Sequence, residues 1–223
     1  MFYLNSAKLI EISSIARRFY GLKLLIKQGL TDESKWFLLN REKLKFTTEF
    51  ASNGLVLDIG AYLGDFIYKL SKLKPGMTFK AYEPVPEFYE KCVSRFNEKK
   101  NIQVFPYAVT SDGRDIDFSI DGPRSKAEAS ENNPVYRSLS VDQIMVGIDE
   151  VELLKMNIEG MEYECLIRLF ENGEIRKIRH LLIQFHNFNS EHEQVYVKIQ
   201  TLLEKDFTSL FKFKWKWELW RIK

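Results

Sequence analysis

The chain has 223 residues, 45% of them hydrophobic, which is enough to bury one sizeable core with only a modest appendage. Its 33 basic and 31 acidic residues leave a formal net charge of +2, and this balance argues against a dedicated nucleic-acid binder. No apolar run approaches the roughly 20 residues that cross a bilayer, and no signal-peptide pattern opens the chain, so we expect a cytoplasmic protein.

The first fifty residues differ from the rest of the chain. Their pattern predicts two or three helices, and in residues 1–30 several basic side chains stand against a single acid, Glu11. The basic residues include Lys8, Arg17, Arg18, Lys23 and Lys27. We predict that residues 1–50 form a helical extension that docks on the sheet as a cap. The alternative is an amphipathic basic helix that makes peripheral contact with an anionic membrane surface.

From about residue 55, short apolar runs alternate with helical patterns, which is typical of a parallel sheet wrapped by helices. The predicted strands are residues 55–59, 78–82, 102–109, 115–120, 151–158 and 178–185. The predicted helices are residues 65–73, 86–98, 161–170 and 191–205. Residues 207–222 alternate apolar and basic side chains, which predicts one or two terminal strands. Residues 51–223 therefore predict a Rossmann-like α/β domain, with a mostly parallel twisted sheet and helices on both faces.

Residues 121–137 are predicted to be the longest stretch without regular structure. Long loops in compact domains are usually functional or disordered, so we expect this one to be the lid over an acceptor. Its basic residues Arg124, Lys126 and Arg137 either bind phosphate or carboxylate groups of a glycan or are solvated charges.

A turn with two glycines joins the first predicted strand to its helix. Gly60 and Gly64 let backbone amides approach a ligand, and the N-terminus of the following helix favours a carboxylate or phosphate. Asp58, just before the turn, suits the ammonium group of S-adenosylmethionine. Together with Ala61 and Tyr62, these residues form the first part of a predicted cofactor site.

The second predicted strand is followed by Glu83 and Pro84. A carboxylate at this place accepts hydrogen bonds from both ribose hydroxyls of a bound nucleoside, and proline offers the adenine a flat apolar neighbour. A dinucleotide site would need the pattern Gly-x-Gly-x-x-Gly, but Tyr62 occupies the position of the second glycine. We therefore favour S-adenosylmethionine over NAD, and an ordinary turn without a ligand is the remaining alternative.

Five short motifs follow one another between residues 50 and 190. They are residues 58–65, 82–86, 107–113, 140–142 and 154–162. In this order they resemble the FkbM family of methyltransferases, whose most diagnostic stretch is Lys-x-Asp-x-Glu-Gly-x-Glu. The resemblance implies a class I methyltransferase fold, S-adenosylmethionine as cofactor, and O-methylation, often of sugars in polysaccharides, glycolipids or natural products. It also implies that the segment with Tyr107 and Ala108 lines the adenine.

Two positions depart from the family pattern. Tyr62 stands where many members have Asn, in the part of the motif that would contact the methionine end of the cofactor. Asn157 replaces the usual Asp, which speaks against a metal ligand or a carboxylate base at this position.

Methyl transfer to a hydroxyl needs an in-line approach to the methyl carbon and a group that takes the proton. In an open α/β sheet these groups lie at the carboxyl ends of the strands, where we place the candidate catalytic residues Asn157, Glu159 and His186. His186 is the first candidate base, because an unperturbed pKa of about 6.5 suits neutral pH; substrate binding and a structural role are its alternatives. Glu159 is the second candidate, and stabilising the next helix N-terminus is its alternative role. Lys155, in mid-strand, is predicted to pair with an acid.

The sequence thus predicts a methyltransferase that acts on a sugar hydroxyl in polysaccharide biosynthesis or a related pathway, with a saccharide or glycan acceptor and no nucleic-acid partner. Two alternatives remain: a nucleotide-dependent oxidoreductase, and a catalytically silent module that binds the cofactor. Cys92 and Cys165 are predicted to be buried thiols, and no cluster of His, Cys, Asp or Glu has the spacing of metal ligands. No metal is therefore expected.

Overall fold

The computed structural model describes residues 31–32, 35–36, 41–117 and 134–223. The chain divides into two compact units, Met1–Glu42 and Lys43–Lys223. The helical extension predicted for residues 1–50 lies mostly outside the described residues. Within the first unit, the indole nitrogen of Trp36 donates a hydrogen bond to Glu42 at 3.1 Å. A 3₁₀ helix, η1 (Arg41–Phe46), precedes the second unit's first strand.

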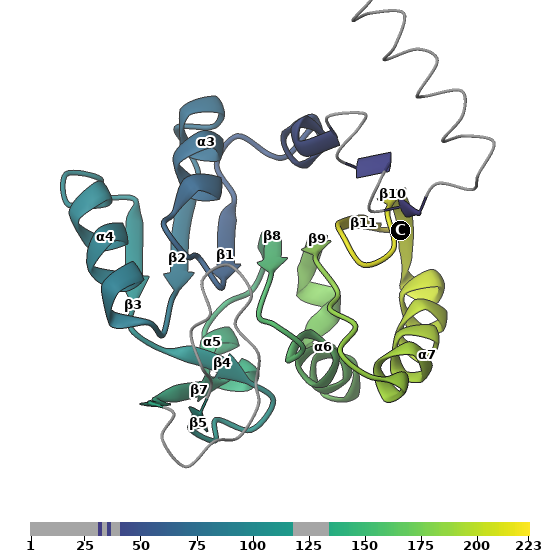
Figure 1. The fold of residues 1–223 in the computed structure, drawn as a ribbon. Helices are drawn as coiled ribbons and strands as arrows, with labels where there is room; N and C mark the ends of the chain where they lie inside the picture. The colour runs from purple at the N-terminus through teal and green to yellow at the C-terminus, as the bar shows by residue number, and fades with distance from the viewer. Residues whose placement is uncertain (1–30, 33–34, 37–40, 118–133) are drawn as a thin grey trace, which may run out of the picture. The chain divides into compact units, whose positions relative to one another are not determined.

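The second unit is built on a seven-stranded sheet with the order β10-β11-β9-β8-β1-β2-β3 (Figure 1). Its strands are β1 (Leu55–Ile59), β2 (Thr78–Tyr82), β3 (Ile102–Phe105), β8 (Val151–Met156), β9 (Ile178–Ile183), β10 (Phe207–Lys212) and β11 (Glu218–Ile222). The five strands from β9 to β3 are parallel, and β11 pairs in the antiparallel sense with both β9 and β10. The predicted mostly parallel sheet is confirmed, and the one or two terminal strands predicted over residues 207–222 are the two strands β10 and β11.

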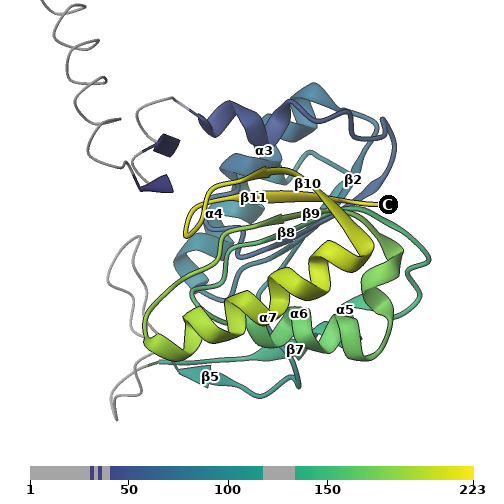
Figure 2. The same ribbon diagram turned by 90° about the vertical axis from the view of Figure 1, so that its right-hand side faces the viewer.

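Helices cover both faces of this sheet, as predicted (Figure 2). On one face lie α3 (Asp65–Leu73) and α4 (Pro86–Phe96). On the other face lie α5 (Val141–Met145), α6 (Glu162–Glu171) and α7 (Ser190–Asp206), and a short 3₁₀ helix, η2 (Glu174–Lys177), connects α6 to β9. Each strand in the middle of the sheet is therefore buried on both sides, which is why all six residues of β8 are buried.

Two charged residues interrupt the apolar interior of the central strands. Lys155 of β8 and Asp58 of β1 are paired in register, and Lys155 Nζ lies 2.8 Å from Asp58 Oδ1. Both side chains are buried, so each supplies the opposite charge that the other needs away from water. The structural pair predicted for Lys155 is confirmed.

The predicted strand over residues 102–109 is wrong, because the chain forms two separate strands there. β3 ends at Phe105, and β4 (Ala108–Thr110) leaves the main sheet to pair in parallel with β7 (Ser138–Ser140). Pro106 lies between them and has no N–H to continue the ladder.

The prediction of no regular structure over residues 121–137 is also wrong at its end. β6 (Val135–Tyr136) pairs in the antiparallel sense with β5 (Ile116–Asp117), while residues 121–133 lie outside the described part. α5 was not predicted from the sequence. It begins with a capping box, in which Ser140 and Gln143 each accept a hydrogen bond from the other's backbone N–H.

Candidate active site

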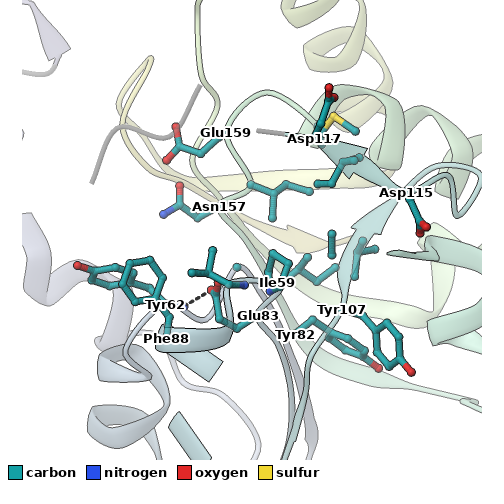
Figure 3. Close-up of a pocket in the computed structure, with 18 of the residues that line it drawn as sticks. Ile59, Tyr62, Tyr82, Glu83, Phe88, Tyr107, Asp115, Asp117, Asn157 and Glu159 are labelled. Atoms are coloured by element: carbon teal, nitrogen blue, oxygen red, sulfur yellow. Dashed lines mark hydrogen bonds between the residues drawn. The ribbon is translucent and has the colours of Figure 1, made fainter. Parts of the chain in front are cut away.

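A cavity of about 550 Å³ opens at the carboxyl ends of β1, β2 and β8. This is the position where the strand order reverses, since β2 follows β1 on one side and β8 lies on the other, and ligands of open α/β sheets bind at such a point. Figure 3 shows Glu83 deep in the cavity, Tyr62 and Phe88 to one side, Tyr107 and Asp115 to the other, and Asn157 and Glu159 above. Gly60, Pro84, Ala108 and Met161 also line it.

The turn after β1 brings two strands together at the base of the cavity. Gly60 has φ +78, and its N–H donates to the carbonyl of Tyr82 at 3.0 Å. A Cβ on Gly60 would lie 2.1 Å from the carbonyl oxygen of Asn157, so only glycine fits between β1 and β8 here. Ala61 and Gly64 lie in the same turn but outside the cavity lining, where Gly64 (φ +74) leads into α3 against the ring of Phe96.

The carboxylate of Asp58 lies beneath this turn and does not line the cavity. It is fully buried and paired with Lys155, whose Nζ also donates to the carbonyl oxygen of Gly60 at 2.6 Å. Burial raises the pKa of Asp58, and the neighbouring Lys155 opposes this rise. Asp58 therefore supports the turn through Lys155 in this structure, and its carboxylate is not presented to a ligand.

Glu83 is a buried carboxylate in the cavity lining, at the end of β2. Its Oε2 accepts the N–H of Tyr62 at 2.7 Å, and its Oε1 accepts the N–H of Val85 at 3.1 Å. Burial raises the pKa of Glu83, while these two backbone bonds and Lys155 oppose the rise. Each oxygen still has an acceptor lone pair, so the group fits a ligand that offers two hydroxyls.

Aromatic rings form the walls on either side of Glu83. Tyr62 and Phe88 pack edge to face with their centroids 4.5 Å apart, and 43% of Tyr62 is exposed. Tyr62 adopts φ +53, which is uncommon for a bulky residue, and its N–H and carbonyl are both held by hydrogen bonds, to Glu83 and from Cys92. Tyr107 and Pro84 line the wall as well, so a planar base has apolar neighbours here.

Asn157 and Glu159 lie at the end of β8, on the wall opposite Glu83 (Figure 3). The buried Asn157 Oδ1 accepts no hydrogen bond from any residue in the described part of the chain. Glu159 has φ +53 and a side chain that is 29% exposed. Burial raises the pKa of Glu159; His186 lowers it and Glu162 raises it further. α6 begins at Glu162 with Met161 as its N-cap, so Glu159 lies two residues before the cap.

His186 follows β9 but does not line the cavity. Its Nδ1 lies 2.8 Å from Glu162 Oε1, and its Nε2 lies 3.4 Å from Glu159 Oε2. Burial lowers the pKa of His186, but the charge and hydrogen bond of Glu162, together with Glu159, outweigh burial and raise it above the ordinary value. From the sequence we expected His186 to have an unperturbed pKa and to lie beside the acceptor. In the structure its ring is enclosed between the carboxylates of Glu162 and Glu159.

Several residues of the site were not singled out from the sequence. The cavity lining includes Phe88, Arg114, Asp115 and Asp117. Glu162 lies outside the lining and binds His186. Asp115 and Asp117 are two positions apart, and Asp117 is in β5. The alternation of side chains along a strand could therefore have placed them on one face. Glu162 is the last residue of the family's diagnostic stretch, and that was the available signal.

Charges around the cavity mouth are unevenly distributed. Arg114 is held by Asp112 at 2.9 Å and by Glu164 at 2.6 Å, whereas Asp115, Asp117 and Glu159 add carboxylates to the lining. Arg137 is exposed, and Arg124 and Lys126 of the predicted acceptor lid lie outside the described residues.

The described residues offer neither a cluster of metal ligands nor a membrane-spanning helix. Among those the structure describes, no group of three His, Cys, Asp or Glu side chains is placed to hold a metal ion. No helix in the described part of the chain is long and apolar enough to span a bilayer. Cys92 and Cys165 are buried free thiols, as predicted.

Comparison with known proteins gives one family. The model of the methyltransferase FkbM domain matches residues 58–209. Among solved structures, methyltransferase FkbM from Methylobacillus flagellatus KT matches with a TM-score of 0.57 at 14% identity, over 94% of this chain and 60% of that one. This match shows the fold, and the chain spans about three fifths of that relative's length.

More distant structural matches are other methyltransferases. Fibrillarin from Aeropyrum pernix, solved with natively bound S-adenosyl-L-methionine, has a TM-score of 0.47 at 13% identity, over 83% of this chain and 74% of that one. An rRNA methylase from Streptococcus thermophilus has a TM-score of 0.49 at 11% identity, over 84% and 96%. None of the curated proteins matches this chain.

Proposed function

This chain belongs to the FkbM family of S-adenosylmethionine-dependent methyltransferases, and from that membership we propose that it methylates a hydroxyl oxygen of a sugar. The sugar is part of a polysaccharide, a glycolipid or a glycosylated metabolite. The observation that carries the proposal is one cavity with the carboxylate of Glu83 on one wall and the polar groups of Asn157 and Glu159 on the other. Cofactor and acceptor thereby meet at one edge of the sheet.

The Glu83 wall is proposed to hold the cofactor. Glu83 accepts the ribose hydroxyls, and Pro84, Tyr107 and Ala108 pack against the adenine. The close backbone approach at Gly60, with Ala61, Tyr62 and Gly64, shapes the turn for the methionine end, and Asp58 supports that turn through Lys155. When bound, S-adenosylmethionine supplies an electrophilic methyl group.

The opposite wall is proposed to hold the acceptor. Asp115, Asp117 and Glu159 place negative charge on the lining, and Arg114, the only cation among the described residues that line the cavity, is already paired with two acids. Carboxylates repel phosphate and uronate groups and accept hydrogen bonds from hydroxyls. The acceptor therefore presents a neutral, hydroxyl-rich ring at this site.

Purified full-length chain tests the proposal directly. S-adenosylhomocysteine release is measured with a panel of neutral sugars linked to nucleotides, neutral glycans linked to lipids, versions of both with a phosphorylated or uronate ring, and small phenols. We expect turnover with a neutral glycan and little with the anionic counterparts or the phenols.

Other outcomes point to the competing functions. Tight binding of S-adenosylhomocysteine without turnover on any acceptor would indicate a silent cofactor-binding module. Binding of NAD in place of S-adenosylmethionine, measured by isothermal titration, would indicate the oxidoreductase alternative.

The basic pattern of residues 1–30, within the extension predicted for residues 1–50, remains a separate prediction. We propose that this extension either docks on the methyltransferase domain, residues 51–223, or contacts an anionic membrane that carries a lipid-linked acceptor. Sedimentation of the full-length chain with anionic and with neutral vesicles distinguishes the two roles.

A further inference from the structure

Glu162 forms the buried end of a connected row of three side chains, Glu162, His186 and Glu159. Its carboxylate is fully buried and accepts three hydrogen bonds, from Ile158 N, Gly160 N and His186 Nδ1, each at 2.8 Å. Three donors stabilise the ionised carboxylate away from water. Glu162 thus fixes both the loop that carries Glu159 and the ring of His186.

His186 is the middle of the row, and its ring has little freedom to turn. The His186 carbonyl accepts the hydroxyl of Tyr163 at 2.5 Å, and the ring stacks on Phe188 with the centroids 5.6 Å apart. The charged groups that act on the imidazole are Glu162, Glu159 and, from the turn between β10 and β11, Lys216, which opposes the two acids. His192 of α7 is the other titratable ring nearby, and its Nδ1 accepts the N–H of Phe188 at 3.2 Å.

Of the three side chains in this row, only Glu159 reaches the cavity. The exposed fraction of the side chain rises from 0% at Glu162 to 12% at His186 and 29% at Glu159, and of the three only Glu159 lines the cavity. Its left-handed backbone is a strained conformation that persists only where the surroundings enforce it. The two bonds from Ile158 and Gly160 to Glu162 bracket Glu159 and enforce it here.

Resting on the proposed function, we propose that Glu159 is the catalytic base of methyl transfer and that His186 and Glu162 are positioning residues that act through it. As the acceptor oxygen bonds to the methyl carbon, the carbon–sulfur bond breaks and its electron pair stays on sulfur. The hydroxyl proton passes to a Glu159 oxygen, and the imidazolium of His186 holds the carboxylate in place from behind. A carboxyl whose pKa is raised by burial is a better base than an exposed one.

The first test measures the coupling between Glu162 and His186 and needs no catalytic turnover. The pKa of His186 is measured by NMR in the full-length chain, and we expect it to fall in Glu162→Gln because the stabilising charge is removed. Glu171→Gln is the matched control, since Glu171 is an exposed acid at the other end of the same helix. An unchanged His186 pKa in Glu162→Gln would overturn the positioning role.

The second test distinguishes the catalytic base, Glu159, from the positioning residue His186. Glu159→Gln should lower kcat by about 10²–10⁴-fold and leave the Kd of S-adenosylhomocysteine unchanged. In His186→Asn, the amide nitrogen replaces Nδ1 against Glu162, so the loop keeps its anchor while Glu159 loses the cation beside it. Since that cation lowers the pKa of Glu159, the acidic limb of the pH profile of kcat should move to higher pH.

The opposite kinetic pattern would overturn the assignment. If Glu159→Gln keeps its kcat while His186→Asn loses the acidic limb altogether, His186 is the base. Failure of the proposed function has a different signature: the wild-type chain then releases no S-adenosylhomocysteine with any acceptor. That result removes the base assignment too, while the NMR titration still reports the coupling of Glu162 to His186.

Discussion

Glu83 is the residue whose removal should affect cofactor binding most directly. Its carboxylate holds the backbone of Tyr62 and Val85 and is proposed to accept two ribose hydroxyls. Hydrogen bonds to a charged group contribute about 1.5–3 kcal/mol each, so Glu83→Ala should weaken S-adenosylhomocysteine binding at least about 10-fold. Isothermal titration measures the change, with Glu87→Ala on the exposed face of α4 as control. Equal affinities in both variants would remove Glu83 from the cofactor site.

Tyr62 shows how a residue can depart from its family pattern without disturbing the backbone around it. The group that Tyr62 gives to the site is its N–H, bound to Glu83, and any residue except proline supplies one. Its side chain points instead to the rim, where it packs on Phe88. Asn adopts the left-handed conformation of this position more readily than Tyr does, and hydrogen bonds to the N–H and the carbonyl of Tyr62 hold it there.

At the scale of elements, a buried carboxylate ties α7 to the terminal strand. Glu218 of β11 accepts hydrogen bonds from Tyr196 at 2.5 Å and Gln200 at 2.9 Å, both on α7, and from the indole of Trp220 at 3.0 Å. Burial raises the pKa of Glu218, and these three donors oppose the rise. The hairpin of β10 and β11 is thereby fixed against α7.

Removal of this carboxylate should destabilise the whole domain. Glu218→Ala leaves three buried donors without their acceptor, and each unsatisfied group costs about 1–3 kcal/mol. Urea denaturation should show a loss of several kcal/mol in the free energy of unfolding. Glu204→Ala, at an exposed position of α7, should change it by less than about 0.5 kcal/mol. A similar small loss in both variants would mean that water replaces the missing acceptor.

At the scale of the whole molecule, the proposed chemistry runs without a metal ion. Asn157 takes the place of a carboxylate at the end of β8, and the described residues contain no cluster of metal ligands. We therefore expect methyl transfer to continue in EDTA at the rate measured without it. Complete loss of activity that magnesium restores would contradict this expectation and point to ligands from the substrate or from the remaining part of the chain.

The sequence alone predicted the strands and helices of the parallel sheet, and it placed the turn at Gly60 and the carboxylate of Glu83 at strand ends that meet at one cavity. Local signals suffice for these features: apolar runs define the strands, glycines define the turn after β1, and Glu83 lies directly at a strand end. The break between β3 and β4 was missed, although Pro106 marked it, because a strand's partner is not visible in its own residues.

Only the tertiary structure decided how the catalytic candidates relate to one another. From the sequence, His186 and Glu159 were independent candidates at the ends of two strands. In the folded chain the parallel pairing of β8 with β9 brings them to 3.4 Å, with Glu162 behind His186 and Glu159 alone facing the cavity. Burial and neighbouring charges then set both pKa values, and these depend on residues about 25 positions apart in the chain that meet only when the sheet forms.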